Sequence, residues 1–207
     1  EMTDVANAAY DGADAILLRS ETAHGQFVEK AVANVAAILR DAEVGVDHYS
    51  QFNTIRNFTP KPMATLEAMA SSAVKAAIDM GAVMMCIVTN TVAPIRAVTK
   101  YRPSQVVVVC TTQQHVAKQC NLYYGTVPLL LPSTRMNLGQ IRDKVVEYGR
   151  KQGLAAFSTG DAHGDQLIMF TGPQSGLFVT DEELPEMEFV TMIVGDELSE
   201  IMASKGY

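Results

Sequence analysis

The sequence MMCIVTNTVAPIRAVTKYRPSQVVVVC, residues 84–110, has two short apolar runs separated by a polar turn and a helical pattern. The runs Met84–Val88 and Val106–Cys110 contain no charged residue, which is typical of parallel strands covered on both faces. Pro94 stands where a helix would begin, and Pro103 follows its expected end. The stretch therefore predicts a strand–helix–strand unit, from which parallel sheets are built.

The same alternation continues on both sides of this unit. Apolar residues recur at helical spacing from Ala64 until Gly81 ends the pattern. Further along the chain we expect strands at residues 126–131, 167–170 and 189–194 and helices at residues 113–121 and 138–149. The fold class expected for the domain is α/β, with a mostly parallel five-stranded sheet between two layers of helices. Ligands of such sheets bind at the carboxyl ends of the strands.

The N-terminal part follows a different pattern. Residues 1–43 read as helix, strand and helix, with the strand at Ala15–Leu18. One strand cannot form a sheet, so we expect the remnant of a larger parallel structure, whose apolar strand packs against a neighbouring chain or is poorly ordered. The opening at Glu1, directly in a helical pattern, suggests a chain cut from a longer one. We place a loosely patterned connector at residues 44–62, the α/β domain at 63–195 and a C-terminal extension at 196–207.

The composition excludes several classes of function. The net charge of −7 and the absence of Trp argue against nucleic-acid binding, which needs a surplus of Lys and Arg. The three cysteines form no C-x-x-C pair, so a structural zinc site is not expected. We find no signal peptide and no apolar stretch long enough to span a bilayer. We therefore expect a cytoplasmic protein with no membrane partner.

A series of short motifs resembles the pyruvate kinase family. Asp4–Ala8 with Asp11–Asp14 is similar to that family's "SDVANAVLDGAD", and Leu18–Gly25 to its "LSGETAKG" at the last strand of a (β/α)₈ barrel. The C-terminal domain of the family is echoed in the same order by Glu67–Ala70, Thr89, Lys100–Pro103, Leu122–Gly125, Pro128, Gly164–Asp165 and Thr171–Gly172. The resemblance extends to about Gly176 and implies the end of a truncated barrel followed by the family's C-terminal α/β domain.

The resemblance also implies an activity for the whole protein. Pyruvate kinases transfer phosphate from phosphoenolpyruvate to ADP with Mg²⁺ and usually K⁺. The lysine, acidic metal ligands and arginine of that chemistry lie upstream of this chain in the family pattern, so we expect no catalytic residue, no metal site and no activity in this fragment. The C-terminal domain implies a homo-oligomer, typically a tetramer, and in many relatives binds a sugar-phosphate activator.

The turn Arg19-Ser20-Glu21-Thr22 would lie at the mouth of the barrel, where chemistry is located in this fold. The family has Ser-Gly where this chain has Arg19-Ser20. Arg19 could contact an anionic nucleotide or substrate, obstruct the mouth or pair with a carboxylate. We favour a structural interpretation in which Glu21 and Thr22 cap the following helix.

Two loops are candidates for an effector site. The first contains Thr89, Asn90 and Thr91 and resembles the family's "TKSGRS" without its Lys, Gly, Arg and Ser. The alternative is an ordinary turn in which Asn90 caps the helix and Pro94 starts it. The second loop contains Thr171, Gly172, Ser175 and Gly176 and resembles the loop that closes over the activator. An acidic insertion at residues 181–188 would repel a bisphosphate.

Three further interpretations remain open on the sequence alone. The domain could be a stand-alone phosphate sensor in a protein whose barrel is degenerate, or it could only mediate self-association. Asp161, His163 and Asp165 alternate in a glycine-rich turn, but two or three ligands so close in sequence rarely bind a metal.

Overall fold

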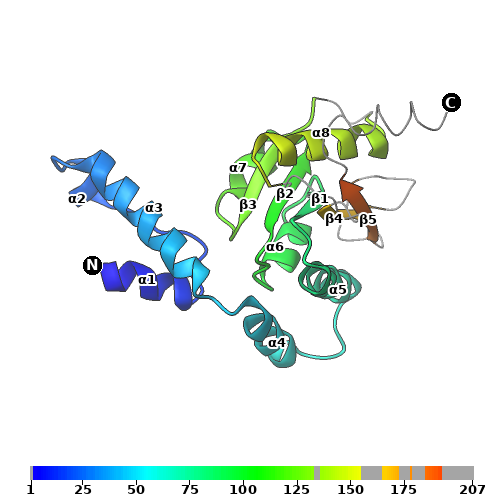
Figure 1. The fold of residues 1–207 in the computed structure, drawn as a ribbon, viewed down its shortest axis with the longest axis horizontal. Coiled ribbons are helices and arrows are strands. Elements are labelled where there is room, and N and C mark those ends of the chain that lie inside the picture. The colour runs from blue at the N-terminus through cyan, green and yellow to red at the C-terminus, as the bar shows by residue number, and fades with distance from the viewer. Residues whose placement is uncertain (1, 133–135, 155–164, 173–177, 179–184, 193–207) are drawn as a thin grey trace.

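The structure is a computed structural model that describes residues 2–132, 136–154, 165–172, 178 and 185–192. An α/β domain carries the only sheet among these residues, and an N-terminal arm of helices extends away from it (Figure 1). A fourth helix, α4, lies between the arm and the domain.

The five strands of the sheet lie in the order β3-β2-β1-β4-β5. β1, β2, β3 and β4 are parallel, and β5 runs antiparallel to β4. Their bounds are Met84–Val88 for β1, Val106–Thr111 for β2, Thr126–Leu130 for β3, Asp165–Thr171 for β4 and Glu186–Met192 for β5. The mostly parallel five-stranded sheet predicted from the sequence is therefore confirmed. Its central strand β1 is fully buried along its length.

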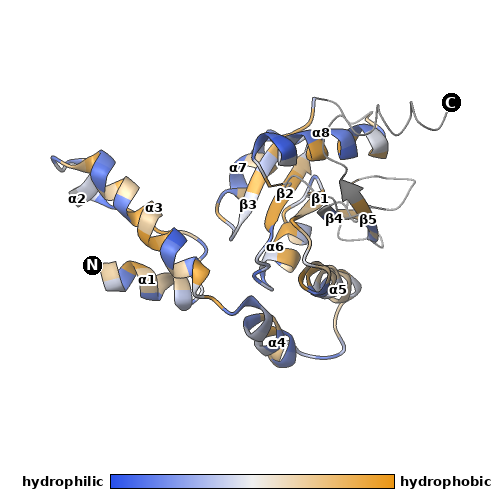
Figure 2. Ribbon diagram, in the orientation of Figure 1, coloured by the Kyte–Doolittle hydropathy of each residue, from blue (hydrophilic) through white to orange (hydrophobic). Residues whose placement is uncertain are grey.

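Helices cover both faces of the sheet, which confirms the predicted three layers. α5 (Thr65–Met80), α6 (Ala93–Thr99) and α7 (Gln114–Cys120) supply buried residues to one apolar cluster, and α8 (Leu138–Lys151) supplies them to the other. The strands supply alternate residues to the two clusters; Met85 and Ile87 of β1 belong to the first, and Met84 and Cys86 to the second. Figure 2 shows apolar strands between helices that are polar on their outer faces.

Two helix ends follow the local signals in the sequence. α5 stops at Gly81, which adopts a left-handed φ of 62° that glycine tolerates without strain. α8 begins with a capping box, in which the Asn137 side chain accepts from the Gln140 amide and the Gln140 side chain accepts from the Asn137 amide.

The arm contains α1 (Met2–Tyr10), α2 (Ser20–Ala23) and α3 (Val28–Val44). The strand predicted at Ala15–Leu18 is wrong, because these residues form no regular structure. A strand is stabilised by hydrogen bonds to a neighbouring strand, and the described residues provide no such neighbour here. Leu17 is accordingly 82% exposed.

The connector is not loosely ordered throughout, which corrects the expectation for residues 44–62. It contains α4 (His48–Phe58), which begins where the Asp47 side chain accepts from the Ser50 amide. Phe52 is completely buried, and Ile55 packs one turn later against the same core.

The last strand also begins earlier than expected, so Glu186 and Glu188 belong to β5 rather than to an insertion before it.

None of the helices in the described part of the chain is long and apolar enough to cross a membrane. Cys86, Cys110 and Cys120 are buried free thiols.

Candidate functional site

The turn Thr89–Thr91 follows β1 at the carboxyl end of the sheet. The Thr89 hydroxyl accepts from the Thr91 amide at 3.0 Å and donates to the Thr91 carbonyl at 3.1 Å. The Thr89 amide donates to the Cys110 carbonyl at 3.0 Å, which continues the pairing of β1 with β2. Thr89 is completely buried. The Thr89 hydroxyl therefore stabilises the turn through two hydrogen bonds to the backbone of Thr91.

Asn90 joins this turn to the end of β2. Its side-chain oxygen accepts from the Thr111 hydroxyl, the Thr112 amide and the Thr112 hydroxyl, each at 3.0 Å. The interpretation of Asn90 as the helix cap is wrong, because α6 has Val92 at its N-cap position and no side-chain cap. Asn90 is instead a cross-link between two strand ends, which holds the turn in one conformation.

The second candidate loop leaves the sheet beside the first. β4 pairs with β1 as far as Phe170, opposite Ile87, so Thr171 and Gly172 leave a strand adjacent to the one that leads into Thr89. Thr171 is 2% exposed. Ser175 and Gly176 lie outside the described residues. The structure thus places the described parts of both predicted effector loops at neighbouring strand ends, where α/β sheets bind ligands.

The four residues predicted at the barrel mouth lie on the arm, away from the two effector loops. Ser20, Glu21 and Thr22 form α2, and Arg19 precedes it at the N-cap position. α3 begins at Val28, and Thr22 lies within α2 rather than at the N-cap position of α3, which is Phe27, so the capping role predicted for Thr22 is wrong. Figure 1 shows α2 at the end of the arm that points away from the sheet. The barrel-mouth and effector residues are therefore not brought together in this chain.

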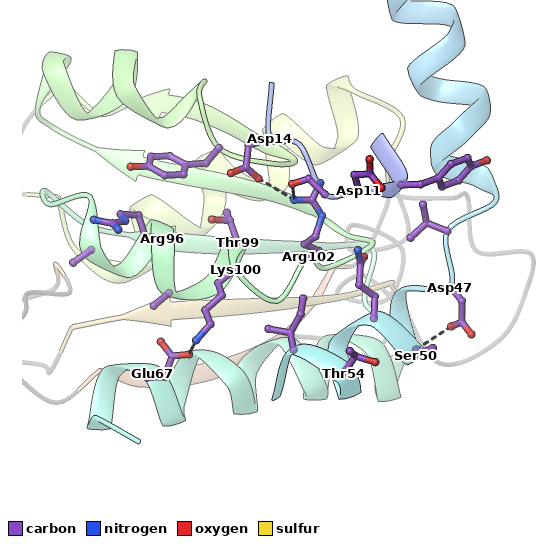
Figure 3. A pocket seen from close by; sticks show the side chains of 18 of the residues that line it. Asp11, Asp14, Asp47, Ser50, Thr54, Glu67, Arg96, Thr99, Lys100 and Arg102 are labelled. Atoms are coloured by element: carbon purple, nitrogen blue, oxygen red, sulfur yellow. Dashed lines mark hydrogen bonds and ion pairs between the residues drawn. The ribbon is translucent and has the colours of Figure 1, made fainter. Parts of the chain in front are cut away.

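A groove of about 1140 Å³, lined by charged, polar and apolar residues, lies between the end of the arm, α4, α5 and α6. Figure 3 shows two separate charged pairs in it, Arg102 with Asp14 and Lys100 with Glu67. Sequence reasoning missed this groove, because its residues come from segments that are far apart in the chain.

Arg102 is the most highly connected side chain of the groove. One guanidinium nitrogen donates to the Gly12 carbonyl at 2.9 Å and to the Asp14 carboxylate at 3.0 Å, and the other donates to the Ala13 carbonyl at 2.9 Å. The guanidinium also lies 4.1 Å from the centre of the Tyr124 ring, a favourable cation–π distance. We call this set the Arg102 clamp.

The backbone around Arg102 also connects segments of the chain. Arg102 adopts a left-handed φ of 49°, which is costly for a residue with a side chain. Its carbonyl lies 3.1 Å from Nδ1 of His48 at the start of α4, so the ring donates to it in the Nδ1–H tautomer. The arm, the connector and the α/β domain thus meet at one residue. Both sides of the Arg102 clamp lie in family motifs found in the sequence, Lys100–Pro103 and Asp11–Asp14, but nothing in the sequence indicated that the two motifs are in contact.

A second polar cluster lies at the other side of the groove. One carboxylate oxygen of Glu67 accepts from the Tyr101 hydroxyl at 2.5 Å and from the Lys100 ammonium at 2.6 Å. Burial of the phenol, and next the hydrogen bond to Glu67, raise the pKa of Tyr101 above its usual value. The neighbouring Arg96 is exposed, and no hydrogen bond or ion pair of its side chain was found within the described residues.

Comparison with known proteins identifies the domain. Residues 67–180 match the family model of the pyruvate kinase alpha/beta domain. The chain is 31% identical over 188 residues to the pyruvate kinase of Lachancea kluyveri and 32% identical over 180 residues to that of Dictyostelium discoideum. These alignments cover 83% and 86% of this chain but only 37% and 34% of the relatives, so the chain spans little more than a third of their length.

Solved structures agree with this match. The crystal structure of a pyruvate kinase from Cryptosporidium parvum superposes with a TM-score of 0.80 at 31% identity, covering 93% of this chain and 36% of that one. The same parasite's enzyme in complex with ADP gives a TM-score of 0.79. The superposition includes nearly the whole chain, so the arm as well as the sheet has a counterpart in those proteins. The chain belongs to the pyruvate kinase family and contains the family's C-terminal α/β domain.

Proposed function

We propose that this chain is the regulatory and subunit-assembly portion of a pyruvate kinase that transfers phosphate from phosphoenolpyruvate to ADP. The fragment itself is inert in that reaction, because the groups that handle phosphoenolpyruvate belong to the rest of the barrel. Mg²⁺ and K⁺ serve the whole enzyme. Among the described residues, no group of three or more His, Cys, Asp or Glu side chains could hold a metal ion.

The observation that carries the regulatory proposal is the position of α6. This helix starts two residues after the Thr89–Thr91 turn and ends three residues before Arg102. A ligand that shifts the turn would move one end of a short, packed helix, whose other end leads into the Arg102 clamp on the barrel segment. The helix is tightly held, with Ile95 and Val98 completely buried. Packed elements of this kind move as rigid units.

The effector would bind at the carboxyl ends of β1 and β4, between the turn and the loop that begins at Thr171. Backbone amides and hydroxyls are the donors available there, because the stretches 89–94 and 171–176 contain no Lys or Arg. A ligand with one phosphate therefore fits this site better than a sugar bisphosphate, whose additional charge would lack cationic partners.

A second candidate function is assembly alone. The Thr89 hydroxyl and the Asn90 side-chain oxygen are both engaged by internal hydrogen bonds, as expected of a turn with a structural role. The exposed apolar side chains on the arm favour burial against another part of the protein or another subunit, with Leu17 82%, Phe27 65% and Val44 88% exposed.

A thermal-shift titration separates the two candidates. The chain is titrated with hexose and pentose monophosphates, fructose bisphosphates, AMP and inorganic phosphate. Saturable stabilisation, about 2.7 kcal/mol at 100 times the dissociation constant, supports an effector site if it is lost in the Thr89→Ala/Thr91→Ala double variant. Ser72→Ala is the matched control, because it removes a hydroxyl bonded within the exposed part of α5. If no ligand shifts the melting temperature, the effector site is refuted and assembly remains.

Light scattering tests the assembly role independently. We expect the chain to self-associate, and the Leu17→Ser variant to dissociate at higher protein concentration than the unmodified chain. A chain that is monomeric at all concentrations would contradict assembly through this fragment.

A further inference from the structure

Two thiols are in contact at the centre of the sheet. Cys86 of β1 and Cys110 of β2 are completely buried, and their sulfur atoms lie 3.6 Å apart. Both side chains belong to the apolar cluster beneath α8. The third thiol, Cys120, lies in the cluster on the opposite face and donates to the Ala117 carbonyl. Cys86 and Cys110 therefore form a separate pair.

The strand register gives this pair an unusual geometry. Cys86 is opposite Val108, and Cys110 is opposite Val88, so the two cysteines are diagonal neighbours. Neighbouring strands lie about 4.8 Å apart and rise about 3.3 Å per residue, so Cα atoms displaced by two residues on adjacent parallel strands are about 8 Å apart, whereas a disulfide usually needs about 4.4–6.8 Å. A bond between the sulfur atoms is within reach only if β2 moves relative to β1.

The movement would be transmitted directly to the Thr89–Thr91 turn. The Cys110 carbonyl accepts from the Thr89 amide at 3.0 Å. The next residue, Thr111, donates from its hydroxyl to Asn90. Any displacement of Cys110 along the sheet therefore strains the two hydrogen-bond connections that hold the turn to β2.

We propose that Cys86 and Cys110 are an oxidative modification site, at which a peroxide converts the dithiol into an intrachain disulfide and loosens the Thr89–Thr91 turn. In the first step one thiolate attacks a peroxide oxygen, the O–O bond breaks, a sulfenic acid forms, and the other oxygen leaves as hydroxide, which takes up a proton to give water. The second thiol then attacks that sulfur, the S–S bond forms and water leaves. Two electrons pass from the sulfur atoms to the peroxide, and both thiol protons end in water.

The surroundings make this reaction slow and its product persistent. The hydrogen bond with Cys110, together with burial, raises the pKa of Cys86 well above its usual value, so little thiolate is present in the closed protein. Peroxide reaches the pair when the cluster under α8 opens locally. The same burial then protects the disulfide from reductants. The site would respond to sustained rather than brief oxidation.

The test treats the full chain with hydrogen peroxide, blocks free thiols in denaturant and maps peptides by mass spectrometry. We expect a linked Cys86–Cys110 peptide pair, lighter by two hydrogen atoms, that dithiothreitol separates. Cys86→Ala and Cys110→Ala each abolish the link, while the control Cys120→Ala retains it. Met2 is 71% exposed, so its sulfoxide shows that the oxidant has acted. Free Cys86 and Cys110 in protein with oxidised Met2 would overturn the proposal.

Hydrogen exchange tests the link to the turn. The Thr89 amide should lose protection in the oxidised chain and regain it after reduction, while amides in the middle of α5 remain unchanged. A disulfide that leaves the Thr89 amide protected would overturn the coupling. A looser turn would affect regulation only if the proposed effector site exists, so that consequence rests on the proposed function. The peptide mapping and the hydrogen-exchange measurement use no effector. Failure of this proposal and failure of the thermal-shift titration are therefore distinguishable.

Discussion

The guanidinium of Arg102 donates to the Asp14 carboxylate at 3.0 Å across a separation of 88 residues. The Arg102 side chain is 10% exposed, whereas that of Asp14 is 48% exposed. Water therefore screens the carboxylate, and the ion pair by itself contributes little to stability. The hydrogen bonds to the backbone carbonyls of Gly12 and Ala13 contribute more to the stability of the contact. Without them the buried guanidinium would have few alternative acceptors.

Because the ion pair contributes less than the other contacts of Arg102, we expect substitutions of Asp14 and Arg102 to have unequal effects on stability. Asp14→Ala should lower the free energy of unfolding by about 0.5 kcal/mol, as expected of an exposed ion pair. Arg102→Ala should lower it by about 2 kcal/mol, because it removes several charge-assisted hydrogen bonds and the contact with the Tyr124 ring. Urea denaturation measures both changes. Arg96→Ala is the control, since this exposed arginine lines the same groove. Equal losses for Asp14→Ala and Arg102→Ala would contradict the assignment.

Asn90 offers a test of the cross-link between strand ends. Asn90→Ala leaves the Thr112 amide and two hydroxyls without their acceptor, so we expect a loss of about 1–2 kcal/mol in the free energy of unfolding. Asn90→Asp keeps an acceptor oxygen and should retain most of that stability. The exchange rate of the Thr112 amide is a local readout and should rise in Asn90→Ala. If both variants were equally unstable, the acceptor role would be wrong.

The sequence predicted the sheet well because the signals for it are local. Met84–Val88 and Val106–Cys110 are continuous apolar runs, and the proline and glycine residues between elements restrict where each one ends. The same reasoning failed at Ala15–Leu18, where an apolar run of strand length has no strand beside it among the described residues. Apolar composition favours a strand but does not supply its hydrogen-bonding partner.

The candidate site was predictable only in part. Thr89 and Thr171 each follow directly after a predicted strand, and the structure shows that these two strands are neighbours, which the sequence did not indicate. The cross-link from Asn90 to Thr112 and the Arg102 clamp join residues 22 and 88–90 positions apart, and no spacing rule anticipates such contacts. α4 had a local signal in the Asp47 cap with Phe52 and Ile55, but its polar composition concealed that signal.

Two glycines provide a matched test of backbone conformation. Gly81 has a φ of 62° and open space around the position of a Cβ atom, so Gly81→Ala should cost about 1 kcal/mol through backbone strain alone. Gly139 lies in the first turn of α8, where a Cβ atom would meet Asn137 Oδ1 at an ordinary 3.4 Å. Gly139→Ala should therefore stabilise the protein by about 0.5 kcal/mol. Thermal denaturation should give shifts of opposite sign, and a lower melting temperature for both variants would refute the argument.

Stability should fall at alkaline pH partly because of Tyr101. Its pKa is raised in the folded protein, by burial first and then by the hydrogen bond to Glu67. Below the unfolded pKa of about 10, tyrosine is protonated in both states and the contribution is complete. Above that pH the unfolded chain releases the proton while the folded protein retains it, so stability declines until the pH passes the folded pKa.

The Tyr101→Phe variant isolates this effect. Phe lacks the hydroxyl that donates to Glu67, so the variant should be less stable at pH 8 but should lose less further stability between pH 8 and about pH 11. Urea denaturation of both proteins across this range gives the two slopes. Burial also raises the pKa of the half-buried Tyr124, but this residue is present in both proteins, so its contribution cancels in the difference. Parallel slopes would show that Tyr101 ionises equally in the folded and unfolded states, which would contradict its raised pKa.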